Sequence, residues 1–269
     1  MINSCINASL TDETALTAAR QVLLRFGSVV LLDPRAGAWE ELADLPSQRL
    51  VNAAAELLRD EMRGRNMELG WGELPAADFD PADVFAALPT SREAMNAHYE
   101  TIFGLLVSGS CPPYETEYIE AKLSFQRAHA LADIGGFYAA FGWRPAADRP
   151  ERVDHLALEF EFMAALCDLE RRAAEAGDGV GRERADVCRA AQGRFLAEHL
   201  AWWLPAFGRL LSLTNPGGYY AAVGTFLRAM LPIQRALLGV APHSGPVTPS
   251  PLERPEECEG CATLGSIQV

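Results

Sequence analysis

The residues best suited to chemistry lie at the start of one strongly apolar segment. Asp154 and His155 come directly before it, and Glu159 follows His155 by four residues, a spacing at which two side chains meet on a helix. Carboxylates and an imidazole can bind a metal ion or transfer protons. Two ligands on one helix still need others from elsewhere, and Asp154 can equally be the N-cap. A helical metal-dependent enzyme using these three residues is therefore one alternative.

A second candidate group surrounds a proline corner. Tyr114 and Tyr118 are four residues apart on either side of Glu115, and they can line a groove or simply stabilise the start of a helix. The sequence contains no phosphate-binding loop, no dinucleotide-binding turn, no Gly-x-Ser-x-Gly motif and no Glu-x-x-His pair. We therefore expect no cofactor.

The six cysteines do not form the pattern of a secreted disulfide scaffold, and a reducing cytoplasm is the simplest location. Cys258-x-x-Cys261 is half of a zinc site or a redox pair, or else two exposed cysteines without a role. A zinc site would need a second ligand pair. The sequence near these cysteines offers only His243.

Charge and composition exclude several classes of function. The chain has 269 residues and a net charge of −13, from 23 basic and 36 acidic residues. Such a surface repels nucleic acid and attracts basic peptides. The apolar runs are far shorter than the roughly 20 residues needed to cross a bilayer, and no secretory signal is visible at the N-terminus. We expect a soluble cytoplasmic protein without membrane insertion.

Apolar residues recur at helical spacing along most of the chain, and no segment alternates as a strand does. The predicted fold is all-α: a single multi-helix domain over residues 1–240, followed by a flexible proline-rich tail over 241–269. The expected helices are 12–32, 47–64, 81–88, 91–109, 116–141, one beginning near Asp154, 182–213 with a kink at Pro205, and 219–238 with a kink at Pro232.

The helix after Asp154 should be the central one. A helical projection places Leu156, Phe160 and Met163 on one side and Phe162 roughly opposite them. A helix that is apolar on two sides must be buried on both. The full projected sets are Leu156, Phe160, Met163 and Cys167 on one side, and Leu158, Phe162, Leu166 and Leu169 on the other.

Three motifs occur in order: PYETEY at 113–118, GFYAAFG at 136–142 and DHLALEFEFM at 154–163. Together they resemble the TorD/DmsD/NarJ family of redox-enzyme maturation chaperones, over residues 110–167. The third motif is most similar to the delta-type chaperones of ethylbenzene, dimethyl sulfide, chlorate and selenate-type molybdoenzymes. Two departures are Val153, where the family usually has proline, and Thr116, where it has serine.

The resemblance implies an all-helical chaperone, not an enzyme, that acts as a monomer or homodimer. Such a chaperone binds the apo catalytic subunit of a molybdoenzyme, often through its twin-arginine signal peptide, before cofactor insertion. A structural subunit of an oxidoreductase complex is the other alternative. The client-binding residues that the resemblance implies are Tyr114, Glu115, Tyr118, Tyr138, Asp154, His155 and Glu159.

Overall fold

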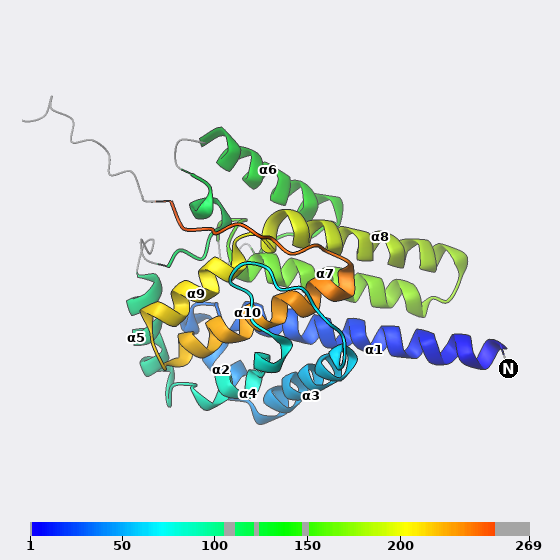
Figure 1. Ribbon diagram of the computed structural model, residues 1–269, viewed down its shortest axis with the longest axis horizontal. Coiled ribbons are helices and arrows are strands. Elements are labelled where there is room, and N and C mark those ends of the chain that lie inside the picture. Colours follow the sequence, from blue (N-terminus) through cyan, green and yellow to red (C-terminus); the bar gives the residue numbers. More distant parts are fainter. Residues whose placement is uncertain (1, 105–110, 121–123, 147–150, 251–269) are drawn as a thin grey trace, which may run out of the picture.

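The computed structural model describes residues 2–104, 111–120, 124–146 and 151–250, with side chains from residue 13 onward (Figure 1). The regular secondary structure of the described residues is helical, apart from one isolated bridge, so the predicted all-α fold is confirmed. None of the described helices is both long enough and apolar enough to cross a membrane. The α-helices are α1 (Ile2–Val29), α2 (Ala38–Ala43), α3 (Leu45–Met62), α4 (Pro81–Ala86), α5 (Arg92–Phe103), α6 (Ser124–Ala140), α7 (Leu156–Glu175), α8 (Gly179–Phe195), α9 (Leu204–Thr214) and α10 (Tyr219–Leu238).

Within the described residues, four short helical turns lie between these helices. Three are 3₁₀ turns, and the fourth is a π-helical turn that joins α8 to α9. They are η1 (Pro34–Ala36), η2 (Ala76–Asp78), η3 (Glu115–Tyr118) and η5 (Leu196–Leu200).

The observed helix ends differ from the predicted ones where local chemistry stops a helix. The helix predicted to reach residue 109 ends at Phe103, because Gly104 adopts a φ of +71° that favours glycine. The helix predicted over 116–141 is divided into the turn η3 and helix α6. Pro205 does not kink a helix. It lies in the first turn of α9, where a missing N–H costs nothing.

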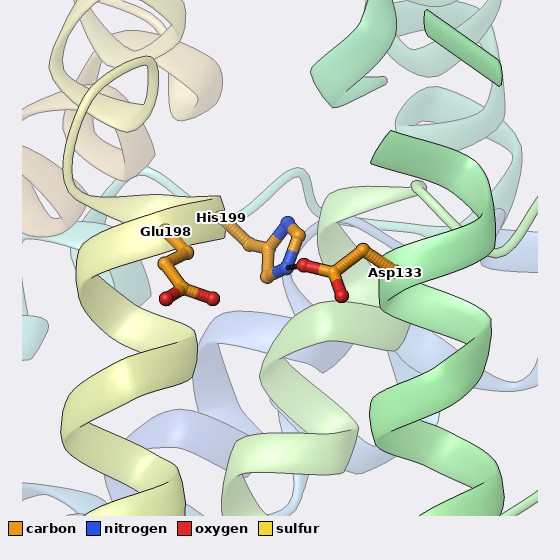
Figure 2. Close-up of side chains that lie close together, drawn as sticks. All are labelled: Asp133, Glu198 and His199. Atoms are coloured by element: carbon orange, nitrogen blue, oxygen red, sulfur yellow. Dashed lines mark ion pairs between the residues drawn. The ribbon is translucent and has the colours of Figure 1, made fainter. Parts of the chain in front are cut away.

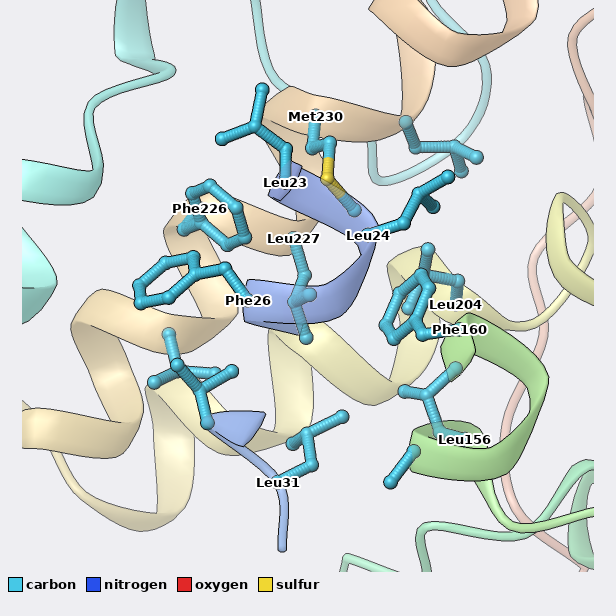
Figure 3. Close-up of a cluster of buried hydrophobic side chains, with 14 of the residues drawn as sticks. Leu23, Leu24, Phe26, Leu31, Leu156, Phe160, Leu204, Phe226, Leu227 and Met230 are labelled. Atoms are coloured by element: carbon cyan, nitrogen blue, oxygen red, sulfur yellow. The ribbon is translucent and has the colours of Figure 1, made fainter. Parts of the chain in front are cut away.

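Helix α7 is central, as its two apolar sides predict. It packs between α1 and α8 (Figure 1). Figure 3 shows Leu156 and Phe160 of α7 meeting α1, α9 and α10 through residues such as Leu24 and Leu204. Phe162 and Leu166 are fully buried on the other side, whereas Leu169 is 39% exposed and Leu158 is half-buried, which departs from the predicted burial.

The hydrophobic core continues around the opposite side of α7. Phe162 lies within 5.0 Å of Phe195 on α8 and within 4.8 Å of Tyr138 on α6, measured between ring centroids. Phe137 of α6 meets Phe195 edge to face at 5.2 Å. These aromatic contacts hold α6 against the body of the domain.

The loop between α3 and α4 is held by α10. The Arg235 guanidinium forms a bidentate ion pair with Glu73, with Nε to Oε1 at 2.7 Å and Nη2 to Oε2 at 2.6 Å. Both side chains are almost completely buried, at 4% and 1% exposure. Arg235 also donates to the carbonyl oxygens of Glu68 and Val240. The buried Arg235 side chain therefore links the loop between α3 and α4 to the end of α10.

Residues 241–250, which the sequence assigns to the tail, lie along the body in extended form (Figure 1). The Trp71 N–H donates to the carbonyl of His243 at 2.8 Å, and the Ser250 N–H donates to the carbonyl of Glu117 at 2.7 Å. Cys258 and Cys261 lie outside the described residues, and the division into a domain and a tail stays a prediction.

Candidate functional site

The proline corner and the start of α7 lie against each other. An isolated antiparallel bridge pairs Tyr114 with His155, and the Glu115 N–H donates to the Asp154 carbonyl at 3.0 Å. The first and third sequence motifs therefore form one structural unit, although about 40 residues separate them in the chain.

Asp154 joins this unit through its side chain. Its fully buried carboxylate accepts hydrogen bonds from the Thr116 N–H at 3.1 Å and the Thr116 hydroxyl at 2.7 Å. The Arg152 guanidinium donates to it at 3.1 and 2.9 Å and also reaches Glu117 at 3.0 Å. The interpretation of Asp154 as the N-cap of the central helix is wrong, because its carboxylate is bonded to the corner instead.

His155 is the N-cap of α7. Its Nδ1 accepts the Ala157 N–H at 3.1 Å, which satisfies one of the free donors of the first turn. Burial lowers the pKa of His155, and the negative charges of Glu151 and Asp154 oppose that shift. An accepting Nδ1 in a neutral ring places the proton on Nε2. His155 is therefore a neutral structural cap.

The three tyrosines of the site differ in their access to solvent. Tyr114 is half-buried, with the Arg152 guanidinium 4.3 Å from its ring centroid and its hydroxyl donating to Glu151 at 3.1 Å. Tyr118 and Tyr138 are buried, and their hydroxyls donate to backbone carbonyls, those of Pro112 and Val153 respectively. Only Tyr114 of the three is placed to contact another molecule directly.

Glu115 and Glu159 form a buried pair of acidic side chains, 2% and 0% exposed. Burial raises the pKa of Glu159 well above its usual range, and the negative charges of Glu115 and Asp154 raise it further. Burial also raises the pKa of Glu115, while His199, with Nδ1 3.1 Å from Glu115 Oε2, lowers it. Burial beside Glu115 and Asp154 therefore favours the protonated form of Glu159 in the folded protein.

These positions do not assemble the metal site that the enzyme alternative needs. Asp154 faces Thr116, the Nδ1 of His155 faces the backbone of its own helix, and Glu159 lies beside Glu115. Three side chains with three different partners cannot converge on one ion.

A surface cavity of about 660 Å³ opens beside His155. Side chains from α1, η1, α5 and α7 line it, together with the segment after α6. Its apolar lining includes Leu31, Leu32, Tyr99, Trp143 and Leu158. Charged side chains at the same cavity are Arg25, Asp33, Arg35, Glu41, Arg144, Glu151 and Glu161.

Comparison with known proteins decides the family. A family model described as the nitrate reductase delta subunit matches residues 74–209, half of the chain, including the corner, the start of α7 and His199. The protein belongs to the nitrate reductase delta subunit family. The resemblance based on the three motifs is confirmed.

Several proteins of similar sequence are named as chaperones. The selenate reductase assembly chaperone of Thauera selenatis is 37% identical over 116 residues, which are 43% of this chain and 56% of that protein. The chlorate reductase assembly chaperone of Ideonella dechloratans is 35% identical over 152 residues, covering 56% and 74% of the two chains. The chaperone TorD of Aliivibrio salmonicida is 28% identical over 122 residues, covering 45% and 54%. No solved structure matches.

Sequence reasoning missed His199, the partner of Glu115 in this delta subunit family protein. The two residues are 84 positions apart, and only the packing of the π-helical turn η5 against the corner brings them together. The available signal was a Glu-His pair, Glu198 and His199, within a mostly apolar stretch. Buried polar side chains in such a stretch need a partner.

The buried acid in α7 predicts an unusual pH dependence for this family member. Replacing Glu159 with Gln should increase the free energy of unfolding at neutral pH. Folding retains a proton on Glu159 that the unfolded chain loses above a pKa of 4.5, so the wild-type protein loses stability as pH rises through that value. Each pH unit between the two pKa values is worth about 1.4 kcal/mol.

Urea denaturation between about pH 4.5 and pH 7.5 measures this difference. The advantage of the Glu159→Gln variant should shrink as the pH falls. Glu175→Gln, at an exposed position on the same helix, is the control and should show no such trend. A gain in stability from Glu159→Gln that does not change with pH would contradict the raised pKa.

Proposed function

We propose that this protein is an assembly chaperone for the catalytic subunit of a molybdenum-containing reductase. It binds that subunit, or its N-terminal signal peptide, in the cytoplasm before the cofactor is inserted. The names of the selenate and chlorate relatives support the proposal, and the cavity beside His155 carries it, because the third motif borders a space large enough for a peptide.

The lining of the cavity suits a segment that is apolar with basic residues at one end. Leu32, Tyr99 and Trp143 can pack against apolar side chains. Arg25 lies between Glu41 at 3.7 Å and Glu161 at 3.5 Å, and its side chain is 59% exposed. An arginine of the client can take its place between these two carboxylates.

Long-range attraction comes from the whole molecule. The cavity itself is nearly balanced, with four carboxylates against three arginines. The net charge of −13 instead produces a negative field around the protein that favours basic partners. We therefore expect salt to weaken client binding mainly through slower association.

A charge placed in the cavity should block client binding. Leu158 is half-buried on the cavity side of α7, so Leu158→Arg fills the space and repels a basic client. We expect at least tenfold weaker binding of the client's N-terminal peptide, measured by fluorescence anisotropy. The control Leu169→Arg lies on the same helix, away from this cavity, and should bind within about twofold of wild type.

The function itself is tested in cells that cannot make the molybdenum cofactor. The wild-type protein should co-purify with the cofactor-free catalytic subunit, and the Leu158→Arg variant should not. Failure to co-purify in these cells, together with recovery of the mature, cofactor-loaded enzyme from cells that do make the cofactor, would instead indicate a structural subunit. If Leu158→Arg matures its client as well as wild type does, the cavity is not the binding site.

A further inference from the structure

Three possible metal ligands meet on the side of the domain where α6 approaches η5. Asp133 of α6 and Glu198 and His199 of η5 each offer a ligand atom, and these atoms all lie within 4.8 Å of one another. Figure 2 shows the His199 ring turned toward Asp133, with Glu198 beside it on the same helical turn. The three residues line a cavity of about 420 Å³ together with His129, which is exposed one turn before Asp133.

His199 is oriented as a metal-binding histidine is. Its side chain is only 4% exposed, and its Nδ1 lies 3.1 Å from Glu115 Oε2. A proton on Nδ1, donated to Glu115, leaves the lone pair of Nε2 facing the cavity. A carboxylate behind the imidazole is the usual support of a metal-bound histidine.

The Nε2 atom is buried and makes no hydrogen bond with any described residue. Asp133 Oδ2 is 3.2 Å away, close enough for an ion pair but not in hydrogen-bond geometry. A buried ring nitrogen without a hydrogen bond loses free energy unless another group satisfies it. A cation held between Nε2 and the two carboxylates would do so.

The π-helical turn explains how two successive residues reach one cavity. Neighbouring side chains on a regular α-helix point about 100° apart. In η5 the Ala201 N–H bonds to the Leu196 carbonyl at 2.8 Å, which widens the turn and changes those directions. Such π turns occur often at functional sites.

We propose that Asp133, Glu198 and His199 bind one divalent transition-metal cation of the Zn²⁺ class. One imidazole nitrogen and two carboxylate oxygens are ligands that Zn²⁺ accepts, and His129 or water completes a four-coordinate site. Bonds of about 2.0–2.2 Å require the ligand atoms to move closer together. Glu198 can move, because its side chain is 41% exposed and, among the described residues, forms an ion pair with the exposed side chain of Arg194.

A metal at this position would connect α6 to the turn between α8 and α9. Through His199 and Glu115 it would also be linked to the proline corner and the start of α7. The site is independent of the proposed chaperone function, because its residues lie outside the cavity beside His155.

Metal binding to the full chain, freed of metal by a chelator, tests the proposal. Isothermal titration with Zn²⁺ should show one equivalent per chain in a Cys258→Ser, Cys261→Ser background, which removes the Cys-x-x-Cys pair as a competing zinc site. Co²⁺ in the same background should give a visible absorption spectrum typical of four-coordinate nitrogen and oxygen ligands.

Asp133→Asn combined with Glu198→Gln should weaken the affinity for Zn²⁺ at least tenfold without unfolding the protein, because both positions reach solvent. Arg194→Gln should strengthen it by releasing Glu198. The control Glu183→Gln, an exposed acid elsewhere on α8, should leave it unchanged. Absence of binding in the Cys258→Ser, Cys261→Ser background, or binding that survives the Asp133→Asn, Glu198→Gln substitution, would overturn the proposal.

Discussion

Replacing Glu73 with Gln should lower the free energy of unfolding by about 3–5 kcal/mol. The substitution leaves the Arg235 guanidinium buried without its counter-charge, and the remaining contacts of Arg235 are neutral carbonyl oxygens. Glu73 Oε2 also accepts the Gly70 N–H at 2.6 Å, so a single Gln oxygen would have to serve both Gly70 and Arg235. Urea denaturation followed by circular dichroism measures the change.

Two further variants test whether the loss of stability comes from leaving the Arg235 charge buried without a partner or only from losing one ion-pair contact. Glu73→Gln combined with Arg235→Met should recover much of the lost stability, because no unpaired charge stays buried. Glu61→Gln removes an exposed ion pair with Arg65 and should change the free energy of unfolding by less than about 0.5 kcal/mol. A Glu73→Gln variant as stable as Glu61→Gln would show that the buried pair contributes little.

Replacing Asp154 with Asn should cost about 2–4 kcal/mol of stability, although the two side chains have nearly the same shape. Both oxygens of the Asp154 carboxylate accept hydrogen bonds, from Thr116 and from Arg152. The Asn amide nitrogen would face one of these donors, and the guanidinium would lose its charged partner. Arg152 is 38% exposed, so the expected cost is smaller than for a completely buried pair.

Asp44, which does cap a helix, is the control for the Asp154→Asn prediction. Asp44 caps α3 by accepting the Ser47 N–H at 2.9 Å, and Asp44→Asn should be nearly neutral because Asn caps about as well. Both variants are compared by the midpoint of urea denaturation. If Asp154→Asn is as mild as Asp44→Asn, the carboxylate does not hold the corner to α7. If the large effect is confirmed, a loss of client activity in Asp154 variants cannot be assigned to client contact.

The sequence predicted the arrangement of helices better than the contacts of polar side chains. The two apolar sides of α7 were visible in its spacing because burial follows helical periodicity. The role of Asp154 was not visible, because its partner Thr116 is 38 residues away and an Asp before a helix has the pattern of a cap. Distant hydrogen bonds leave no mark on local periodicity.

In the candidate site, too, contacts between residues far apart in the sequence could not be predicted. The resemblance named Tyr114, Glu115 and His155 among the client-binding residues, but the spacing of the motifs could not show that Tyr118 and Tyr138 are buried and bonded to backbone carbonyls. His199 was missed because it reaches Glu115 only through a π turn, and helical periodicity does not predict such a turn. The same turn ends α8 before Pro205, so Pro205 begins a new helix. Because the π turn was not predicted, the sequence placed Pro205 inside one long helix and predicted a kink there.

The packing of α1 on α7 also determines when the protein can fold during its synthesis. The chain must extend by roughly 130 residues beyond the end of α1 before the start of α7 is made, which takes roughly 6–25 s at typical translation speeds. During that interval Leu23, Leu24 and Phe26 lack the helices that cover them in Figure 3. Ribosome-associated factors that bind short apolar helices would therefore meet this chain early. Slowing translation between α1 and α7 should increase its aggregation in cells.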